Sequence, residues 1–200
     1  MNVPSGAILN GGRASRFEGR DKGALTVEGR TVRDIQLSVL MQAVDEVIVV
    51  GGRSDEAAWP QDIRYVEDLV SGRGPLAGLQ AALLAARFDP VLVVACDMPG
   101  LTVPFVKLLL AGALEIENVD AVVPRTQSGY HPLCAVYRRS CLPIVSRHLA
   151  AGRLALRDLL TEVRVREVTE TELAPIGRPS TLLANLNTPA DYRALLNHDS

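Results

Sequence analysis

Four cationic side chains crowd one short stretch near the N-terminus, ILNGGRASRFEGRDKGAL. They are Arg13, Arg16, Arg20 and Lys22. Cations this close repel one another unless an anion lies among them. Gly11 and Gly12 directly precede them, and paired glycines allow backbone N–H groups to turn together toward an anion. The stretch therefore predicts a phosphate-binding loop, in which Arg16 binds phosphate oxygens bidentately and Lys22 binds them as a point charge.

Two familiar phosphate-binding motifs are absent from the chain. No G-x-G-x-x-G follows the first apolar run, and G-x-x-x-x-G-K-[ST] occurs nowhere. The stretch reads instead G-G-x-x-x-R-x-x-G-x-D-K. A solvated basic loop that only joins a strand to a helix is the alternative interpretation.

An aspartate follows the apolar run VLVVA, in the sequence Cys96-Asp97-Met98-Pro99. Carboxylate oxygens are the ligands that Mg²⁺ prefers, so we interpret Asp97 as a metal ligand. An alternative, compatible with metal binding, is that Asp97 caps the helix that begins near Thr102 or fixes the Met98-Pro99 turn.

Short β-branched runs alternate with segments of helical spacing over at least the first 125 residues. The expected strands are 7–9, 46–50, 63–66, 91–95, 121–123, 134–136 and 163–168, and the expected helices are 31–43, 76–87, 102–116 and 188 to about 196. Most of these runs are apolar on both faces, which is typical of strands in a sheet covered on two sides. We therefore predict an α/β fold: a three-layer, Rossmann-like domain with a mainly parallel central sheet. Residues 167–180 look like an irregular surface excursion.

In an open α/β sheet, ligands bind at the carboxyl ends of the strands. This rule selects the loops 10–22, 51–53, 68–78 and 97–100, which contain both the cationic stretch and Asp97.

The composition is that of an ordinary globular protein, and we expect one domain over residues 1–200. With 200 residues and a net charge of −2, the chain has no overall basic field to attract nucleic acid or a membrane surface. Because it has neither a leader-like start nor an apolar stretch of about 18 residues, we expect a cytoplasmic protein. Its three cysteines include no C-x-x-C pair, so we expect reduced, packed thiols.

The cationic stretch resembles the nucleotidyltransferase signature L-x-G-G-x-x-x-R-[MF]-x-G-x-D-K. The matching positions are Leu9, Gly11, Gly12, Arg16, Phe17, Gly19, Asp21 and Lys22. Within that superfamily the chain is most similar to the molybdenum cofactor guanylyltransferases, and the likeness continues in EDLVSGRGPLAG, ACDMPGL, YHPLCAVY and NLNTPADY. It covers nearly the whole length and implies a nucleotidyltransferase domain with a nucleotide half, about 1–100, and an acceptor half, about 101–200. The usual L-A-G-G has Asn10 in place of alanine.

The resemblance also implies which residues contact the substrates. The expected nucleotide-binding residues are Leu9, Asn10, Gly11, Gly12, Lys22, Gly52, Asp68, Gly74, Pro75, Leu76, Gly78 and Asp97, with the G-P-L-A-G stretch beside the guanine base. The expected catalytic residues are Arg16, Lys22 and Asp97, with Asp97 also binding Mg²⁺. The pterin acceptor is expected near Tyr130, His131, Asn185 and Asn187.

These features together predict an Mg²⁺-dependent guanylyltransferase. It would join GMP from GTP to molybdopterin or its molybdenum form and release pyrophosphate, with cofactor-delivery or acceptor enzymes as possible protein partners. One alternative keeps the chemistry and changes the substrates, as in a cytidylyltransferase or a sugar-phosphate nucleotidyltransferase. Another is a regulatory domain that binds GTP without turning it over.

Overall fold

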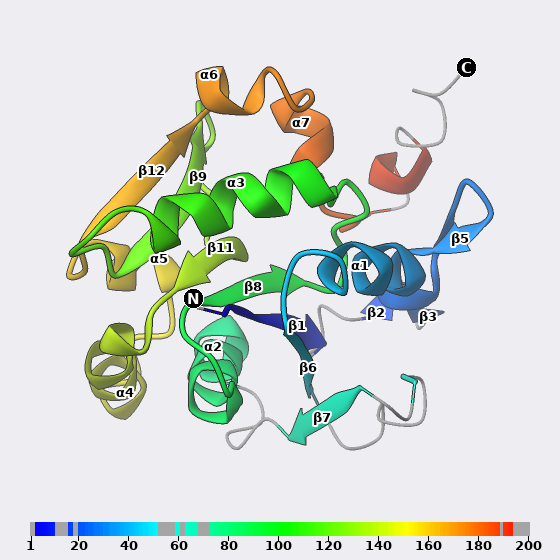
Figure 1. Cartoon of the computed structure of the whole chain (residues 1–200). Helices are drawn as coiled ribbons and strands as arrows, with labels where there is room; N and C mark the ends of the chain where they lie inside the picture. Colours follow the sequence, from blue (N-terminus) through cyan, green and yellow to red (C-terminus); the bar gives the residue numbers. More distant parts are fainter. Residues whose placement is uncertain are drawn as a thin grey trace.

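An eight-stranded sheet forms the centre of the computed structural model, which describes residues 3–10, 16–17, 20–51, 59–60, 63–67, 73–188 and 190–193 (Figure 1). The strands are β1 Ser5–Asn10, β6 Glu46–Gly51, β7 Arg64–Glu67, β8 Val91–Ala95, β9 Ala121–Thr126, β10 Gly129–Tyr130, β11 Cys134–Tyr137 and β12 Val165–Thr169. They follow the order β10-β9-β11-β8-β1-β6-β7, and β12 pairs with β9.

The sheet is mostly parallel, as the sequence predicts. Strand β1 runs parallel to β6 and β8, β6 runs parallel to β7, and β12 runs parallel to β9. Strand β11 is antiparallel to both β8 and β9, so β8 and β9 point the same way. The carboxyl ends of β1, β6, β7, β8, β9 and β12 therefore lie at one edge, which we name the carboxyl edge.

Helices cover both faces of the sheet and give the predicted three layers (Figure 1). Their bounds are α1 Val32–Leu40, α2 Gly74–Ala85, α3 Val103–Leu114, α4 Leu142–Ala150, α5 Leu156–Leu160, α6 Glu170–Leu173 and α7 Pro179–Leu182. One core layer joins α1 and α3 to residues such as Ile8, while the other joins α2 and α4 to Ala7. Successive strand residues thus pack on opposite faces.

Threonines cap two of the predicted helices. The Thr31 hydroxyl accepts a hydrogen bond from the backbone N–H of Asp34 at 3.1 Å, and the Thr102 hydroxyl accepts one from Phe105 at 3.4 Å. The helix at Thr102 is therefore capped by that residue and not by Asp97.

Small ribbons lie between β1 and α1. Strand β2, Arg16–Phe17, pairs with β3, Arg20–Asp21, and β4, Thr26–Val27, pairs with β5, Arg30–Thr31. A short 3-10 helix, η2 Lys22–Ala24, connects the two ribbons. A second, η4 Arg139–Cys141, precedes α4.

The interpretation of residues 167–180 as an irregular surface excursion is wrong. Val168 lies in β12 and Leu173 in α6, and both are fully buried. A capping box between Thr169 and Glu172 ends the strand and begins the helix. In the described part of the chain, no helix has both the length and the apolarity that crossing a membrane requires.

Candidate functional site

A buried lysine and a buried aspartate meet at the carboxyl edge. The Nζ atom of Lys22 donates hydrogen bonds to Oδ2 of Asp97 and to Oδ1 of Asn187, each at 2.9 Å. Lys22 is 3% exposed and Asp97 is 8% exposed. Withdrawing two charges from water this far costs solvation energy, which their attraction and the bond to Asn187 offset. Because ligands bind at this edge in α/β sheets, the pair marks the candidate reaction centre.

The N-terminal ribbon and α1 position Lys22. In the β2–β3 ribbon Arg16 pairs with Asp21, the residue directly before Lys22. The backbone carbonyl of Lys22 accepts a hydrogen bond from Leu25, whose own carbonyl accepts one from Val32 at the start of α1. The ribbon thus brings two expected catalytic residues of the signature, Arg16 and Lys22, close together in the backbone.

Three segments fix the backbone around Asp97. The N–H of Cys96 donates to the carbonyl of Leu9 in β1 at 3.2 Å, and the N–H of Leu186 donates to the carbonyl of Asp97 at 2.9 Å. Gly100 lies so close to the C-terminal segment that a Cβ there would come within 1.9 Å of the Thr181 carbonyl oxygen. The turn after β8 is therefore held between β1 and the chain after α7.

A buried amide that the sequence interpretation missed also contacts this turn. The Gln36 side chain in α1 is fully buried, and its Nε2 atom donates to the carbonyls of Ala95 at 2.7 Å and Met98 at 3.1 Å. The signal was present in the sequence, because Gln36 shares one helix face with the apolar residues Val32 and Leu40. A polar residue on a core-facing stripe needs a partner.

Several of the expected nucleotide-binding residues gather around the start of α2 and the end of β1. Gly74 has a φ of 68°, in the left-handed region that favours glycine. Gly78 allows α2 to pack closely on β1, since a Cβ there would lie 3.3 Å from Leu9 Cδ1. The side chains of Leu9 and Leu76 belong to the core between these elements. Pro75 occupies the first turn of α2.

Asn10 ends β1 with a buried acceptor that lacks a partner. The residue is 2% exposed, and its Oδ1 atom has no hydrogen-bond partner among the described residues. An unpaired buried acceptor is costly, so it marks a place where a ligand donor or a cation would be favourable.

Four expected nucleotide-binding residues lie outside the described residues: Gly11, Gly12, Gly52 and Asp68. Arg16 is described only through its backbone pairing with Asp21.

A cavity of about 410 Å³ lies at the same edge in the second half of the chain. It is lined by Thr126, Gln127, Ser128, His131, Glu170, Pro179, Ser180 and Leu183. Thr126 ends β9 and Glu170 directly follows β12, so the cavity opens beside two parallel strand ends. Its hydroxyl, amide, imidazole and carboxylate groups can hydrogen-bond a polar ligand.

The two expected acceptor residues of the β10 region differ in their contacts. His131 is half-buried and lies 2.9 Å from the Thr126 hydroxyl through Nε2, and burial together with the charge of Arg157 lowers its pKa. Tyr130 instead donates a hydrogen bond to Glu167, and the Arg125 guanidinium covers its ring at 5.2 Å. Of these two residues, only His131 lines the cavity.

The two expected acceptor asparagines also differ in their contacts. Both are exposed, but the Asn187 side chain bonds to Lys22, whereas the Asn185 carbonyl accepts a hydrogen bond from the Asn187 backbone at 3.1 Å. Asp191 braces Asn187, because its carboxylate accepts hydrogen bonds from the backbone N–H groups of Asn187 and Thr188 at 3.0 and 2.8 Å. These bonds and the nearby Lys22 charge lower the pKa of Asp191.

The donor set around Asp97 fits a magnesium ion carried by a nucleotide. No group of three or more His, Cys, Asp or Glu side chains within the described residues is placed to hold a metal ion by itself. Mg²⁺ typically takes one or two carboxylates and fills its shell with water and substrate phosphates. The Asp97 carboxylate binds the Lys22 ammonium through Oδ2, so its surroundings accommodate a positive charge.

The cysteines do not supply a nucleophile. Cys134 and Cys141 are buried, and burial raises the pKa of each thiol to about 12. Cys96 is also buried, as a reduced cysteine. At neutral pH the Cys134 and Cys141 thiols stay protonated, and the thiolate is the reactive form.

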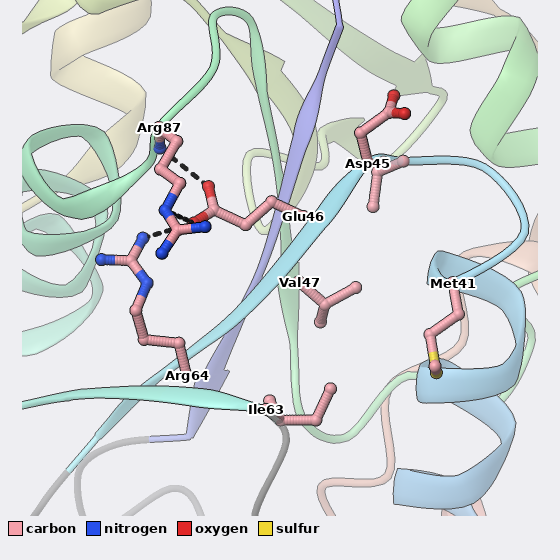
Figure 2. A pocket seen from close by; sticks show the side chains of 8 residues that line it. Met41, Asp45, Glu46, Val47, Ile63, Arg64 and Arg87 are labelled. Atoms are coloured by element: carbon pink, nitrogen blue, oxygen red, sulfur yellow. Dashed lines mark hydrogen bonds and ion pairs between the residues drawn. The ribbon is translucent and has the colours of Figure 1, made fainter.

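A second cavity, of about 360 Å³, lies at the opposite edge, where β6 begins (Figure 2). Glu46 accepts hydrogen bonds there from the Ser5 hydroxyl and the Arg87 backbone at 2.7 Å each, and from Arg64 at 2.5 Å. These hydrogen bonds outweigh burial and lower the pKa of Glu46. The cluster ties β1, β6 and β7 together, and it lies at the opposite end of the strands from Asp97.

The arrangement of strands and helices is the α/β nucleotidyltransferase fold. The fold matches the crystal structure of molybdopterin-guanine dinucleotide biosynthesis protein A from Archaeoglobus fulgidus, with a TM-score of 0.81 and 23% identity over 98% of each chain. The chain belongs to the family of MobA-like NTP transferases, whose model matches residues 6–168.

Curated relatives agree with this assignment over nearly the full length. A molybdenum cofactor guanylyltransferase from Desulfosudis oleivorans is 32% identical over 189 residues, which are 94% of this chain and 92% of the relative. A probable molybdenum cofactor guanylyltransferase from Pelotomaculum thermopropionicum is 35% identical over 96% of this chain and 91% of its own. The family resemblance predicted from the sequence motifs is confirmed.

Proposed function

We propose that this protein transfers GMP from GTP to molybdopterin or its molybdenum form and releases pyrophosphate. The observation that carries the proposal is the buried pair at the carboxyl edge between Lys22, which ends the signature stretch, and Asp97, which follows β8. The names of the curated relatives favour this acceptor and this nucleotide over the alternatives.

The reaction joins two anions, so charge neutralisation and positioning carry most of the catalysis. An oxygen of the terminal phosphate of the acceptor attacks the α-phosphorus of GTP and forms a new P–O bond. The bond to the β-phosphate breaks, and its electron pair leaves with pyrophosphate. Lys22 and Arg16 are assigned to the phosphate oxygens, together with the backbone N–H groups of Gly11 and Gly12.

Asp97 is assigned to Mg²⁺, which when bound neutralises the developing charge on the phosphates. In the absence of the metal, the Lys22 ammonium satisfies the same carboxylate. When nucleotide arrives, Lys22 can exchange Asp97 for a phosphate oxygen while remaining bonded to Asn187. The lysine thus moves between two anions at one site and never leaves a charge unpaired.

The nucleotide half, about 1–100, is proposed to bind GTP along the ends of β1 and β6 and the start of α2. The unpaired Oδ1 atom of Asn10 supports this assignment, because it can accept a hydrogen bond from the nucleotide. Gly74, Pro75 and Gly78 form the flat start of α2 that would border the base, with Leu9 and Leu76 supporting it from the core. Gly52 and Asp68 complete the set.

The acceptor half, about 101–200, is proposed to bind the pterin in the cavity that His131 lines, and Asn185 and Asn187 are proposed to contact it on the side of the reaction centre, where Asn187 bonds to Lys22. Tyr130, which donates a hydrogen bond to Glu167, is the remaining proposed acceptor residue. We also propose that the reaction takes place in the cytoplasm and that the partner proteins are enzymes that deliver or receive the cofactor.

Pyrophosphate release with GTP, CTP, ATP and UTP, each with Mg²⁺ and molybdopterin or its molybdenum form, tests the proposal. We expect release with GTP only. Thermal unfolding adds an independent readout, because a ligand at about 100 times its Kd adds about 2.7 kcal/mol to stability. Protection by CTP without protection by GTP would assign the chain to cytidylyl transfer, and GTP protection without turnover would leave it a binding domain.

A further inference from the structure

A glutamine amide in the core holds both ends of the turn that presents Asp97. Gln36 lies in the middle of α1, fully buried, and its Nε2 atom donates to the carbonyl oxygens of Ala95 and Met98. Ala95 is the last residue of β8, and Met98 directly follows Asp97. The two hydrogen bonds therefore bracket the aspartate on both sides.

A primary amide is suited to bonding two carbonyls at once. The two N–H groups of one amide nitrogen diverge, so a single nitrogen can serve two carbonyls that face it from different directions. The other amide atom, Oε1, is buried without a hydrogen-bond partner in the described part of the chain. Since a buried unpaired oxygen is unfavourable, the donors account for a glutamine at this core position.

The carbonyl of Asp97 has a different partner. The carbonyl oxygen of Asp97 itself accepts a hydrogen bond from the N–H of Leu186, in the segment that also carries Asn187. Gln36 from one side and Leu186 from the other therefore fix the peptide groups on which the Asp97 carboxylate depends.

The helix that carries Gln36 is also joined to the residues that carry Lys22. Helix α1 begins with Val32, which donates to the carbonyl of Leu25, and Leu25 donates to the carbonyl of Lys22. Through Val32 on one side and Gln36 on the other, helix α1 is therefore hydrogen-bonded to both segments that supply the ion pair.

We propose that Gln36 is a positioning residue for nucleotidyl transfer, which sets the place of the Asp97 carboxylate relative to Lys22. This inference rests on the proposed function. Gln36 does not touch the substrates, and its effect is exerted through the turn from Ala95 to Met98. Loss of the two hydrogen bonds lets the turn relax, so Asp97 presents its oxygens to the metal less well while the phosphate contacts of Lys22 persist.

The test uses Gln36→Met, which keeps the length of the side chain and removes both donors. Mn²⁺ binding is measured by electron paramagnetic resonance in the presence of a GTP analogue with a methylene α,β bridge, and nucleotide binding is measured without metal. Loss of an outer partner of a metal ligand typically costs about 10- to 100-fold in metal affinity or activity. We expect a loss of this size in Mn²⁺ affinity and in kcat, with metal-free nucleotide affinity within about threefold of the wild type.

A matched control separates positioning from stability. Leu40→Ala removes a fully buried side chain from the same face of the same helix, one turn further from the Asp97 turn. It should lower the melting temperature and leave Mn²⁺ affinity unchanged. If Gln36→Met does not fold, Gln36→Asn keeps the amide, cannot reach both carbonyls, and should give the same separation of metal affinity from nucleotide affinity.

Two results overturn the inference while leaving the proposed function in place. One is wild-type Mn²⁺ affinity and kcat in the Gln36 variants, and the other is an equal loss in Leu40→Ala. A wild-type protein that neither binds the Mn²⁺-nucleotide complex nor releases pyrophosphate overturns the proposed function, and this inference with it.

Discussion

The Lys22 ammonium lies 2.9 Å from the Asp97 carboxylate, although 75 positions separate the two residues in the chain. The short 3-10 helix η2 supplies Lys22 and the turn after β8 supplies Asp97, so the pair forms only when these distant segments come together. The second bond of Lys22, to Asn187, draws the C-terminal segment into the same site. Three distant parts of the sequence thus meet at one buried charge pair.

Removing the lysine should damage both binding and stability. Lys22→Met leaves the Asp97 carboxylate buried without its cation, and breaking a buried ion pair in this way costs roughly 3–5 kcal/mol. We expect a lower melting temperature, weak GTP binding by calorimetry and no pyrophosphate release. A Lys22→Met protein with the wild-type melting temperature would contradict the account of Asp97 as a charge that needs this partner.

Neutralising the aspartate should instead separate binding from turnover. Asp97→Asn keeps the size of the side chain and an oxygen that can accept from Lys22, while it removes the charge that would bind Mg²⁺. We expect GTP binding in calorimetry to be retained in part and the rate of pyrophosphate release to be nearly lost. Normal turnover in this variant would remove the metal role assigned to Asp97.

The double variant measures how strongly the two residues act as one unit. Combining Lys22→Met with Asp97→Asn removes both charges, so the stability lost in Lys22→Met alone should be partly recovered. Urea unfolding of the wild type, both single variants and the double variant gives the coupling energy. Strictly additive losses would argue that the pair contributes no direct interaction to the fold.

The residues with chemical signatures were the ones that sequence reasoning found best. A basic stretch with paired glycines and an aspartate after an apolar strand are local patterns, so Lys22 and Asp97 could both be predicted as site residues. Their direct contact could not, because it depends on the order of strands in the sheet. The strands with β-branched runs were likewise predicted to within a few residues, as β8 at 91–95 illustrates.

Elements without a strong local pattern were missed or misread. The strand β12 was predicted as residues 163–168, but the short helices α6 and α7 carry too few apolar residues to show a periodic pattern, so residues 167–180 looked irregular. Gln36 was passed over because a single polar residue within an apolar stripe is easily assigned to the surface. Asn187 was expected to bind the acceptor, and its bond to Lys22 depends on how the chain returns after α7.

Acid should weaken the second half of the fold through two carboxylates. The Arg164 guanidinium holds the pKa of Asp120 well below its usual range, and Arg166 with Thr169 lowers the pKa of Glu172 from 4.5 to about 2. A carboxylate with a lowered pKa in the folded state contributes stability above its ordinary pKa and loses that contribution as the pH falls toward the folded value.

The melting temperatures of the wild type, Asp120→Asn and Glu172→Gln between pH 7 and pH 2 test this dependence. We expect each variant to be less stable than the wild type at pH 7. The difference for Glu172→Gln should shrink as the pH falls below 4.5 and largely vanish near pH 2. Parallel curves over the whole range would show that these carboxylates titrate alike in the folded and unfolded chain.

The thiols should be inert while the protein is folded. All three cysteines are buried and reduced, and burial raises the pKa of Cys134 and Cys141 to about 12. We expect no reaction with a thiol reagent such as dithionitrobenzoate at pH 8 in buffer, and reaction of three thiols after denaturation. If alkylation of the folded protein rapidly abolished pyrophosphate release, the site would have to open and expose one of the three thiols.

The turn that presents Asp97 also depends on a glycine that meets the C-terminal segment. A Cβ at Gly100 would lie 1.9 Å from the carbonyl oxygen of Thr181, which is backbone and cannot rotate away. Gly100→Ala must therefore push the turn and the segment after α7 apart. The chain after α7 also supplies the Leu186 bond to Asp97 and the Asn187 bond to Lys22, so such a shift would strain both bonds. We therefore expect lower stability and a large loss of turnover.

Gly177→Ala, at a glycine just before α7, is a matched control. The three atoms nearest to its Cβ would be side-chain atoms of Leu182, the closest at 3.3 Å, and these can shift by a few tenths of an ångström. We expect near-normal pyrophosphate release in Gly177→Ala and a strong defect in Gly100→Ala, measured on the same substrates. Equal activity in the two variants would mean that the C-terminal segment does not hold the Asp97 turn, and that Lys22 and Asp97 keep their geometry without it.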